Sequence, residues 1–278
     1  MKKMAFIGVG NMASATLSGI FSGSDHITEW SDIVLFNRHK EKIEKYREYG
    51  AIIADSLKDA VEVADYVFLC VKPQNFPEIL PYLSECKDVS NKVFITMAAG
   101  ISMKTVSDAA LGASVIRVMP NTPILIGKGV IAACKNEQTS DKDFEFICNI
   151  FNRSGSVIVI RESEMNRIIA VTGSSPAYVF LMIKAIYDGA VAQGLVTNED
   201  RGLSEKEILD GICDTIIGAA TLMKSSNKTP EEQIATVASK GGTTERAIAE
   251  LHNYNFCEGI ISAMQKCTDK AEELGASK

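Results

Sequence analysis

The residues whose spacing best suits chemistry form a glycine-rich turn, Gly8 to Ala13, near the start of the chain. Two glycines and a small third residue between an apolar run and a helical pattern are typical of a dinucleotide-binding turn. Gly8 permits the tight turn, Gly10 lets the backbone approach a pyrophosphate, and the amides of the following helix attract its charge. An ordinary glycine turn is the alternative. We predict nucleotide contacts at Gly8, Val9, Gly10, Asn11 and Met12.

A cationic segment, Phe36-Asn37-Arg38-His39-Lys40, follows the second predicted strand. An enzyme that uses NAD usually places Asp or Glu there, which accepts a hydrogen bond from the 2′-hydroxyl of the ribose. No acid precedes Glu41 here, and a guanidinium binds phosphate through two parallel hydrogen bonds. Asn37 and Arg38 therefore favour the 2′-phosphate of NADPH, with NADH as a second nucleotide that the site could accept. A solvated turn is the alternative.

Two further loops follow the third and fourth predicted strands, and a proline-rich segment, residues 117–123, closes the fifth. The carboxyl ends of parallel strands form the ligand-binding edge of such a sheet. Each loop taken alone is typical of a plain strand end. Together they predict cofactor contacts at Cys70, Val71, Lys72, Pro73, Met97, Ala98 and Ala99.

The elements that must position these loops alternate between short apolar runs and helical segments. Strands are predicted at Met4–Val9, Ile33–Phe36, Tyr66–Val71, Val93–Met97, Ser114–Val118, Gly129–Ala133 and Ser156–Ile160. Helices between them are predicted at residues 14–21, 40–49 and 103–110. This alternation predicts an α/β fold, with a Rossmann-type doubly wound parallel sheet over residues 1–161.

From about residue 162 onward the pattern is helical. Helices are predicted at Pro176–Gln193, Glu205–Ser225, Glu245–Leu251 and Gly259–Leu274. They predict an all-α domain over residues 162–278. A helical domain of this size is small for a core of its own, so we expect it to complete its burial against a second subunit, as a homodimer.

The composition of the 278-residue chain is that of a globular protein, with 46% hydrophobic and 23% charged residues. A formal net charge of −6 argues against a protein that binds nucleic acid or an anionic membrane. No uninterrupted apolar run reaches the roughly 20 residues of a membrane span. Seven scattered cysteines, none spaced as Cys-x-x-Cys, predict reduced thiols in a cytoplasm, and three well-separated histidines predict no metal site.

Taken in order, these motifs resemble those of the pyrroline-5-carboxylate reductase family over nearly the whole chain. The most specific segments are Gly173-Ser174-Ser175-Pro176-Ala177-Tyr178 and Ser239-Lys240-Gly241-Gly242-Thr243-Thr244. The resemblance implies the NADPH-dependent reduction of a small molecule, 1-pyrroline-5-carboxylate, to L-proline, which is the last step of proline biosynthesis. It also implies a Rossmann domain followed by a dimerisation domain, and some members of the family assemble into decamers.

Both helical-domain motifs suit an anionic imine. Pro176 is typical of the first turn of a helix, which would leave the amides of residues 173–175 free. Gly241-Gly242 exposes backbone ahead of a helix start at Thr243, where the amides would hold the substrate carboxylate. The Thr244 hydroxyl is the candidate catalytic group, hydrogen bonding near the ring nitrogen, and plain helix capping is the alternative for both motifs. Substrate contacts are predicted at Ser174, Ser175, Gly241, Gly242, Thr243 and Thr244.

The chain departs from the family pattern at Leu57, Asn166, Ser175, Lys184, Asn227 and Lys240. The family usually has Asp at Asn166 and Pro at Lys240. These departures affect the substrate range more than the reaction type. The alternatives are a related imine reductase, a β-hydroxyacid dehydrogenase, or a catalytically silent NADP-binding protein. Such dehydrogenases need a helix lysine with Asn one turn later, whereas Asp188 follows Lys184, and an intact Gly241–Thr244 segment argues against a silent protein.

Overall fold

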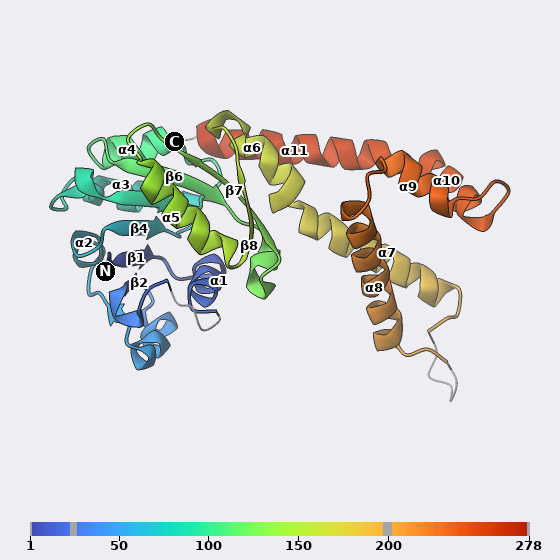
Figure 1. Cartoon of the computed structure of the whole chain (residues 1–278), viewed down its shortest axis with the longest axis horizontal. Coiled ribbons are helices and arrows are strands. Elements are labelled where there is room, and N and C mark those ends of the chain that lie inside the picture. The colour runs from blue at the N-terminus through green and yellow to red at the C-terminus, as the bar shows by residue number, and fades with distance from the viewer. Residues whose placement is uncertain (1, 23–26, 197–201, 277–278) are drawn as a thin grey trace. The chain divides into compact units, whose positions relative to one another are not determined.

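The computed structural model describes residues 2–22, 27–196 and 202–276 of the chain (Figure 1). The chain forms two compact units. The first runs to Pro176 and resumes at Gln265, and the second is Ala177–Met264. The division that the sequence places after residue 161 stays a prediction.

A sheet of eight strands, counted over the described residues, forms the centre of the first unit (Figure 1). The strands are β1 (Met4–Ile7), β2 (Ile33–Phe36), β3 (Ile52–Ile53), β4 (Tyr66–Leu69), β5 (Val93–Thr96), β6 (Ser114–Met119), β7 (Gly129–Lys135) and β8 (Gly155–Val159). Their order is β3-β2-β1-β4-β5-β6-β7-β8. Because the order reverses between β1 and β4, the carboxyl ends of these strands flank a crevice in which such sheets bind ligands.

The predicted doubly wound α/β fold is confirmed, with one difference in strand direction. β7 runs antiparallel to β6, and β8 runs parallel to β7. The connection from β6 to β7 contains only a short 3₁₀ segment, Thr122–Ile126. A parallel connection needs a crossover of about a dozen residues or more, usually through a helix, so the chain turns back on itself here.

Helices cover both faces of the sheet (Figure 1). One face carries α2 (Leu57–Glu62), α3 (Phe76–Leu83) and α4 (Met103–Ala109), and the other carries α1 (Asn11–Ile20) and α5 (Asp141–Asn152). The sheet therefore separates two apolar cores. Phe76 and Phe94 are fully buried in the first, and Phe6 stacks on Phe68 in the second, with ring centroids 4.4 Å apart. These cores hold the strand ends and their loops in place.

The rest of the chain is helical, as the sequence predicts. Its helices are α6 (Met165–Ile168), α7 (Ser175–Ala192), α8 (Glu205–Lys224), α9 (Pro230–Val237), α10 (Thr243–Asn253) and α11 (Phe256–Ala276). A π-helical turn, Ile169–Gly173, joins α6 to α7. The helix expected over residues 40–49 is replaced by two 3₁₀ segments, Lys40–Lys42 and Glu44–Tyr49.

One helical stretch in the described part of the chain, Glu162–Ala192, is long and apolar enough to cross a membrane by length and composition. The sequence expectation concerned uninterrupted apolar runs, and this stretch is not one of them. Arg167, Lys184 and Asp188 interrupt the stretch, while Phe180 and Leu181 are largely exposed on it. A helix with such an apolar surface needs an apolar partner.

Candidate active site

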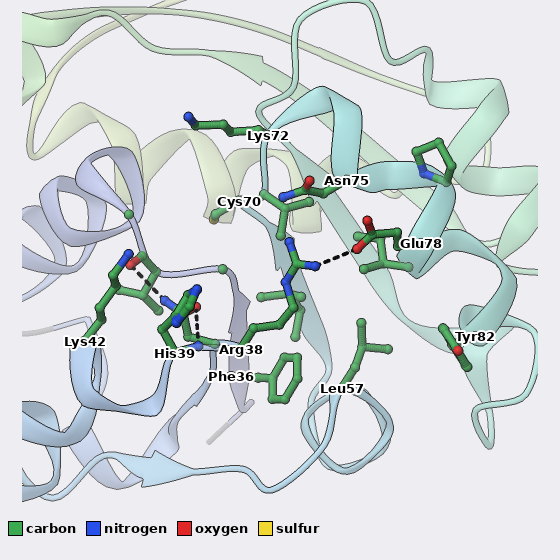
Figure 2. A pocket seen from close by; sticks show the side chains of 18 of the residues that line it. Phe36, Arg38, His39, Lys42, Leu57, Cys70, Lys72, Asn75, Glu78 and Tyr82 are labelled. Atoms are coloured by element: carbon green, nitrogen blue, oxygen red, sulfur yellow. Dashed lines mark hydrogen bonds and ion pairs between the residues drawn. The ribbon is translucent and has the colours of Figure 1, made fainter.

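A cleft of about 720 Å³ opens at the carboxyl ends of β1, β2 and β4 (Figure 2). The structure brings several of the predicted cofactor residues together there, namely Gly8, Val9, Gly10, Asn37, Arg38, Cys70, Val71 and Lys72. Other predicted residues lie outside the described lining of the cleft, namely Asn11, Met12, Pro73, Met97, Ala98 and Ala99. The cleft lies where the strand order reverses, as expected for a nucleotide site.

The glycine turn has a different steric requirement at each glycine. Gly8 has a φ of +85°, and a Cβ atom at this position would lie 2.6 Å from Cγ1 of Val71. Any other residue would therefore be strained and would clash. A Cβ atom at Gly10 would meet no described atom within 4 Å. Gly10 thus leaves open space that a ligand can enter, whereas Gly8 allows the turn itself.

The helix that follows the glycine turn suits a phosphate group. Gly10 is the N-cap of α1, and no side chain among the described residues caps its amides. The first amides of a helix have no partner within the helix, and the helix dipole adds a positive potential there. Together with the open space over Gly10, this arrangement fits the pyrophosphate of a dinucleotide.

Asn37 connects the loop after β2 to the glycine turn. Its Nδ2 donates to the Val9 carbonyl at 3.3 Å, and its Oδ1 accepts from the His39 amide at 3.3 Å. Both ends of the carboxamide are therefore used within the protein. Asn37 holds the backbone of Arg38 beside the cleft.

Arg38 forms an ion pair that the sequence analysis missed. Its Nη1 lies 2.7 Å from Oε2 of Glu78, and both side chains are about 60% exposed. Glu78 belongs to the first turn of α3, a helix that the sequence analysis did not predict. Pro77 followed by an acid is a typical helix start and could have indicated it.

The cleft carries more positive than negative side chains. Arg38, Lys42 and Lys72 line it together with the imidazole of His39, and Glu78 is the one acid among the described lining residues. A concave surface with this excess of basic groups attracts phosphate groups. The local charge is therefore opposite to the net charge of the whole chain.

Cys70 lines the cleft directly after β4. Its backbone amide donates to the Ile7 carbonyl at 2.9 Å, which fixes the end of β4 against β1. Burial raises the pKa of the Cys70 thiol far above its usual value. The thiol is therefore protonated at neutral pH, and a protonated thiol neither attacks carbon nor binds metal well.

The loop after β5 contacts the end of the chain's last helix. Gly100 has a φ of +73°, and a Cβ atom there would lie 2.7 Å from the Gly275 amide nitrogen. Only glycine allows this close approach of α11 to the loop. The predicted cofactor residues Met97, Ala98 and Ala99 directly precede this contact.

In the second unit, the segment Gly241–Thr244 forms the start of α10. Gly241 has a φ of +74°, and Gly242 is the N-cap, without a capping side chain among the described residues. The Thr244 side chain is half-buried and that of Thr243 is exposed. Uncapped amides at this helix start suit a carboxylate group. The Glu245 carboxylate already accepts a hydrogen bond from the Gly241 amide at 2.6 Å.

Pro176 lies in the first turn of α7, as expected, but the amide of Ser174 ahead of it is not free. The Ser174 amide donates to the Ile169 carbonyl at 2.7 Å, and the π-helical turn leads directly into α7. Proline is tolerated here because it follows this irregular turn, where the regular hydrogen-bond pattern is already interrupted. The Ser174 hydroxyl lies 3.2 Å from Sγ of Cys267. Substrate contacts at Ser174 and Ser175 stay a prediction.

Asn166, one of the positions that differ from the family pattern, lies next to a buried arginine and not in the nucleotide cleft. Arg117 is 4% exposed, its Nη2 donates to Oδ1 of Asn166 at 3.1 Å, and its Nη1 lies 3.5 Å from Oε1 of Glu162. The Nε atom of Arg117 has no hydrogen-bond partner in the described part of the chain, and burial lowers the pKa of Arg117. These contacts attach the start of the helical stretch to β6.

Lys184 lacks the surroundings of a catalytic lysine. Its Nζ lies 2.5 Å from Oδ2 of Asp188, four residues along α7, and both side chains are more than half exposed. Such pairs are typical of a solvated helix face. This arrangement gives no support to a β-hydroxyacid dehydrogenase.

The matched families cover most of the chain. The pyrroline-5-carboxylate reductase dimerisation family matches residues 162–274, and the family described as NADP oxidoreductase coenzyme F420-dependent matches residues 3–100. A pyrroline-5-carboxylate reductase of Corynebacterium melassecola is 35% identical over 99% of both chains. The chain belongs to the pyrroline-5-carboxylate reductase family. The resemblance stated from the motifs is thereby confirmed.

Further members of this reductase family support the same assignment. The pyrroline-5-carboxylate reductase of Escherichia coli is 30% identical over 99% of both chains. The crystal structure of Plasmodium falciparum pyrroline carboxylate reductase with NADP bound has a TM-score of 0.86, with 24% identity over 99% of this chain and 98% of that one. At that identity the structure supports the reductase fold, including the helical region that follows the sheet.

Proposed function

We propose that this protein reduces 1-pyrroline-5-carboxylate to L-proline with NADPH, in the last step of proline biosynthesis. The end-to-end match to curated pyrroline-5-carboxylate reductases carries the proposal. The nucleotide cleft and the uncapped start of α10 support it, because the reaction needs a site for a dinucleotide and a site for a carboxylate.

The first unit supplies the nucleotide site. NADPH provides the hydride when bound. Uncapped amides at the start of α1 bind the pyrophosphate, because they offer N–H donors without a capping side chain. Arg38 binds the 2′-phosphate, because its guanidinium carries positive charge and has further N–H donors besides the Nη1 group that pairs with Glu78. The remaining proposed contacts are Gly8, Val9, Gly10, Asn11, Met12, Asn37, Cys70, Val71, Lys72, Pro73, Met97, Ala98 and Ala99.

The second unit supplies contacts for the substrate. The amides of Thr243 and Thr244 hold the carboxylate, and the Thr244 hydroxyl hydrogen bonds near the ring nitrogen. Gly241 and Gly242 of the same unit, and Ser174 and Ser175 of the first unit, complete the proposed contacts. A protonated imine accepts hydride readily, so the protein has to position the reactants and needs no nucleophilic side chain. The neutral Cys70 thiol is consistent with this chemistry.

We also propose a homodimer formed through the helices, with the decamer as a further assembly of such dimers. Large apolar side chains are exposed on α7, α8 and α11, among them Leu181, Ile217 and Ile261, each more than 60% exposed. A second subunit would bury them. In this proposal the apolar stretch Glu162–Ala192 contacts protein, not lipid. All seven cysteines, which lie in the described ranges, are free thiols, which supports a reducing cytoplasm.

The deciding experiment incubates the purified protein with NADPH and 1-pyrroline-5-carboxylate and follows the loss of NADPH absorbance and the formation of proline. We expect stoichiometric conversion. Separate reactions with a cyclic imine that lacks the carboxylate, and with a β-hydroxyacid and NADP⁺, test the alternative enzymes. NADP⁺ binding without turnover of any of these substrates would instead indicate a silent NADP-binding protein.

A further inference from the structure

Glu78 brings a negative charge into a cleft whose other charged groups are basic. Its Oε2 atom lies 2.7 Å from Nη1 of Arg38. Figure 2 shows the two side chains reaching toward each other, Glu78 from α3 and Arg38 from the loop after β2. The guanidinium proposed to bind the 2′-phosphate is thus already paired with a carboxylate.

A 2′-phosphate and the Glu78 carboxylate compete for the same guanidinium. Arg38 binds a phosphate best through two parallel N–H donors, and Glu78 occupies one of its Nη atoms. A phosphate that reaches Arg38 must displace Glu78 or lie beside its negative charge. Both outcomes make the binding of NADPH weaker than in the same cleft without this acid.

Whereas Glu78 repels the 2′-phosphate of NADPH, it can accept a hydrogen bond from the ribose of NADH. Its 2′-hydroxyl is a hydrogen-bond donor, and a carboxylate is an acceptor with two oxygens. The ion pair with Arg38 uses one Glu78 oxygen and leaves the other available. NAD-dependent enzymes commonly place such an acid at the end of the second strand. Here an acid enters the cleft from α3 instead.

Lys42 keeps the cleft attractive to phosphate while Arg38 is paired. It lines the cleft and forms no ion pair with any residue that the structure describes. Its ammonium group therefore remains a point charge to which a 2′-phosphate is attracted. For this reason Glu78 reduces NADPH binding without abolishing it.

We propose that Glu78 is a specificity-determining residue, which lowers the preference of the enzyme for NADPH over NADH through its ion pair with Arg38. This role rests on the NADPH use proposed above. It adds to that proposal a residue on α3 that sets the ratio of the affinities for the two nucleotides.

Calorimetric titration tests the role of Glu78 without any turnover. Adenosine 2′,5′-bisphosphate and AMP differ only in the 2′-phosphate, as NADP⁺ and NAD⁺ do. Glu78→Gln keeps the shape of the side chain and removes its charge. We expect this variant to bind adenosine 2′,5′-bisphosphate and NADP⁺ about tenfold more tightly than the wild type. Affinity for AMP and NAD⁺ should stay the same or fall a few-fold.

Asp55→Asn is the matched control. Asp55 forms an ion pair with Lys40 at 2.7 Å, the same distance as in the Arg38–Glu78 pair, and neither residue is part of the described cleft lining. This substitution removes the same charge from an exposed ion pair outside the cleft. We expect it to change each affinity by less than about twofold.

Combining substitutions tests whether Glu78 acts through Arg38. In an Arg38→Ala background, Glu78→Gln should strengthen the binding of adenosine 2′,5′-bisphosphate by only about threefold, because only the charge repulsion remains to be relieved. An equal gain in both backgrounds would overturn the proposed route through Arg38. Equal melting temperatures of the wild type and Glu78→Gln would show that a change in folding does not cause the difference in nucleotide affinity.

The results separate the role of Glu78 from the proposed function. A wild type that binds NADP⁺ and reduces the imine, with Glu78→Gln indistinguishable from Asp55→Asn, would overturn the role of Glu78 alone. Equal gains for NADP⁺ and NAD⁺ would do the same. A wild type that binds neither NADP⁺ nor adenosine 2′,5′-bisphosphate would overturn both proposals.

Discussion

The side chain of Asn121 forms a hydrogen bond with the main-chain carbonyl of Thr172. Its Nδ2 donates to this carbonyl at 2.9 Å, while its Oδ1 accepts from the Val130 amide at 2.9 Å. Thr172 belongs to the π-helical turn before α7, and Asn121 is 7% exposed. A single buried carboxamide therefore connects the start of β7 to the irregular turn and satisfies a donor on one side and an acceptor on the other.

Asn121→Ala should lower the free energy of unfolding by about 1–3 kcal/mol, because it leaves the Thr172 carbonyl and the Val130 amide without this partner. Urea unfolding measures the change. Thr122→Ala, at the exposed neighbouring position, is the control and should change it by less than about 0.5 kcal/mol. Equal stabilities of the two variants would show that the carboxamide bridge is unimportant.

Gly8→Ala and Gly10→Ala should affect different properties. Gly8→Ala should lower the free energy of unfolding by about 1–3 kcal/mol, since its φ is +85° and its Cβ would clash with Val71. Gly10→Ala should leave stability nearly unchanged but weaken NADP⁺ binding by about tenfold or more, because its methyl group occupies the space proposed for the pyrophosphate. Urea unfolding and calorimetry measure the two effects. If Gly10→Ala bound NADP⁺ with the affinity of the wild type, the proposed position of the pyrophosphate over Gly10 would be wrong.

Asp143 should make stability depend on pH in the acid range. Its burial disfavours the charged form, but hydrogen bonds from Tyr66, Lys2 and Ser140 outweigh this and lower the pKa of Asp143 from 3.8 to about 2. A carboxyl whose pKa is lower in the folded state stabilises the protein above the unfolded pKa, and this contribution disappears as the pH falls from about 4 to about 2.

Asp143→Asn should therefore be less stable than the wild type by about 1 kcal/mol at pH 7, a modest value because Lys2 is half-exposed. The difference should shrink steadily below about pH 4. Urea unfolding at several pH values measures it. Asp141→Asn is the control, because Asp141 lies in the same turn of α5 as Asp143 and its exposed carboxylate pairs with Lys135 of β7. A stability difference that stays constant down to about pH 2 would contradict the low pKa.

Leu181→Glu should break the proposed dimer. Leu181 is 68% exposed on α7, and a charge at a buried interface position costs several kcal/mol of association free energy. Sedimentation should show a dimer or larger assembly for the wild type and a monomer for the variant. Leu125→Glu, at a leucine that is 53% exposed in the first unit, should leave the assembly intact. A fully active monomeric wild type at micromolar concentration would refute the dimer.

Lys240→Pro should leave the Michaelis constant for the substrate nearly unchanged, or lower it slightly by stiffening the loop before Gly241. Lys240 is exposed and forms no ion pair with any described residue. Steady-state kinetics measure the constant, and Lys240→Met separates the loss of charge from the gain of rigidity. A tenfold rise in both variants would identify the lysine as a substrate ligand.

Local patterns were sufficient to predict the glycine turn, the seven longer strands and the division into a sheet region and a helical region. These features depend on residues that are close together in the sequence, through apolar periodicity and the conformational freedom of glycine. The turn at Gly8 is an example, since strand, glycine spacing and helix follow one another within a few residues. The family resemblance rests on the same kind of local motif.

Tertiary structure decided the contacts between distant segments. Arg38 and Glu78 are 40 residues apart and meet only because β2 and β4 lie on either side of β1, whose glycine turn opens the cleft between them. Gly100 contacts Gly275 because the last helix returns to the first unit. Sequence periodicity predicts which face of an element is apolar but not which element it meets, because that choice depends on packing across the whole sheet.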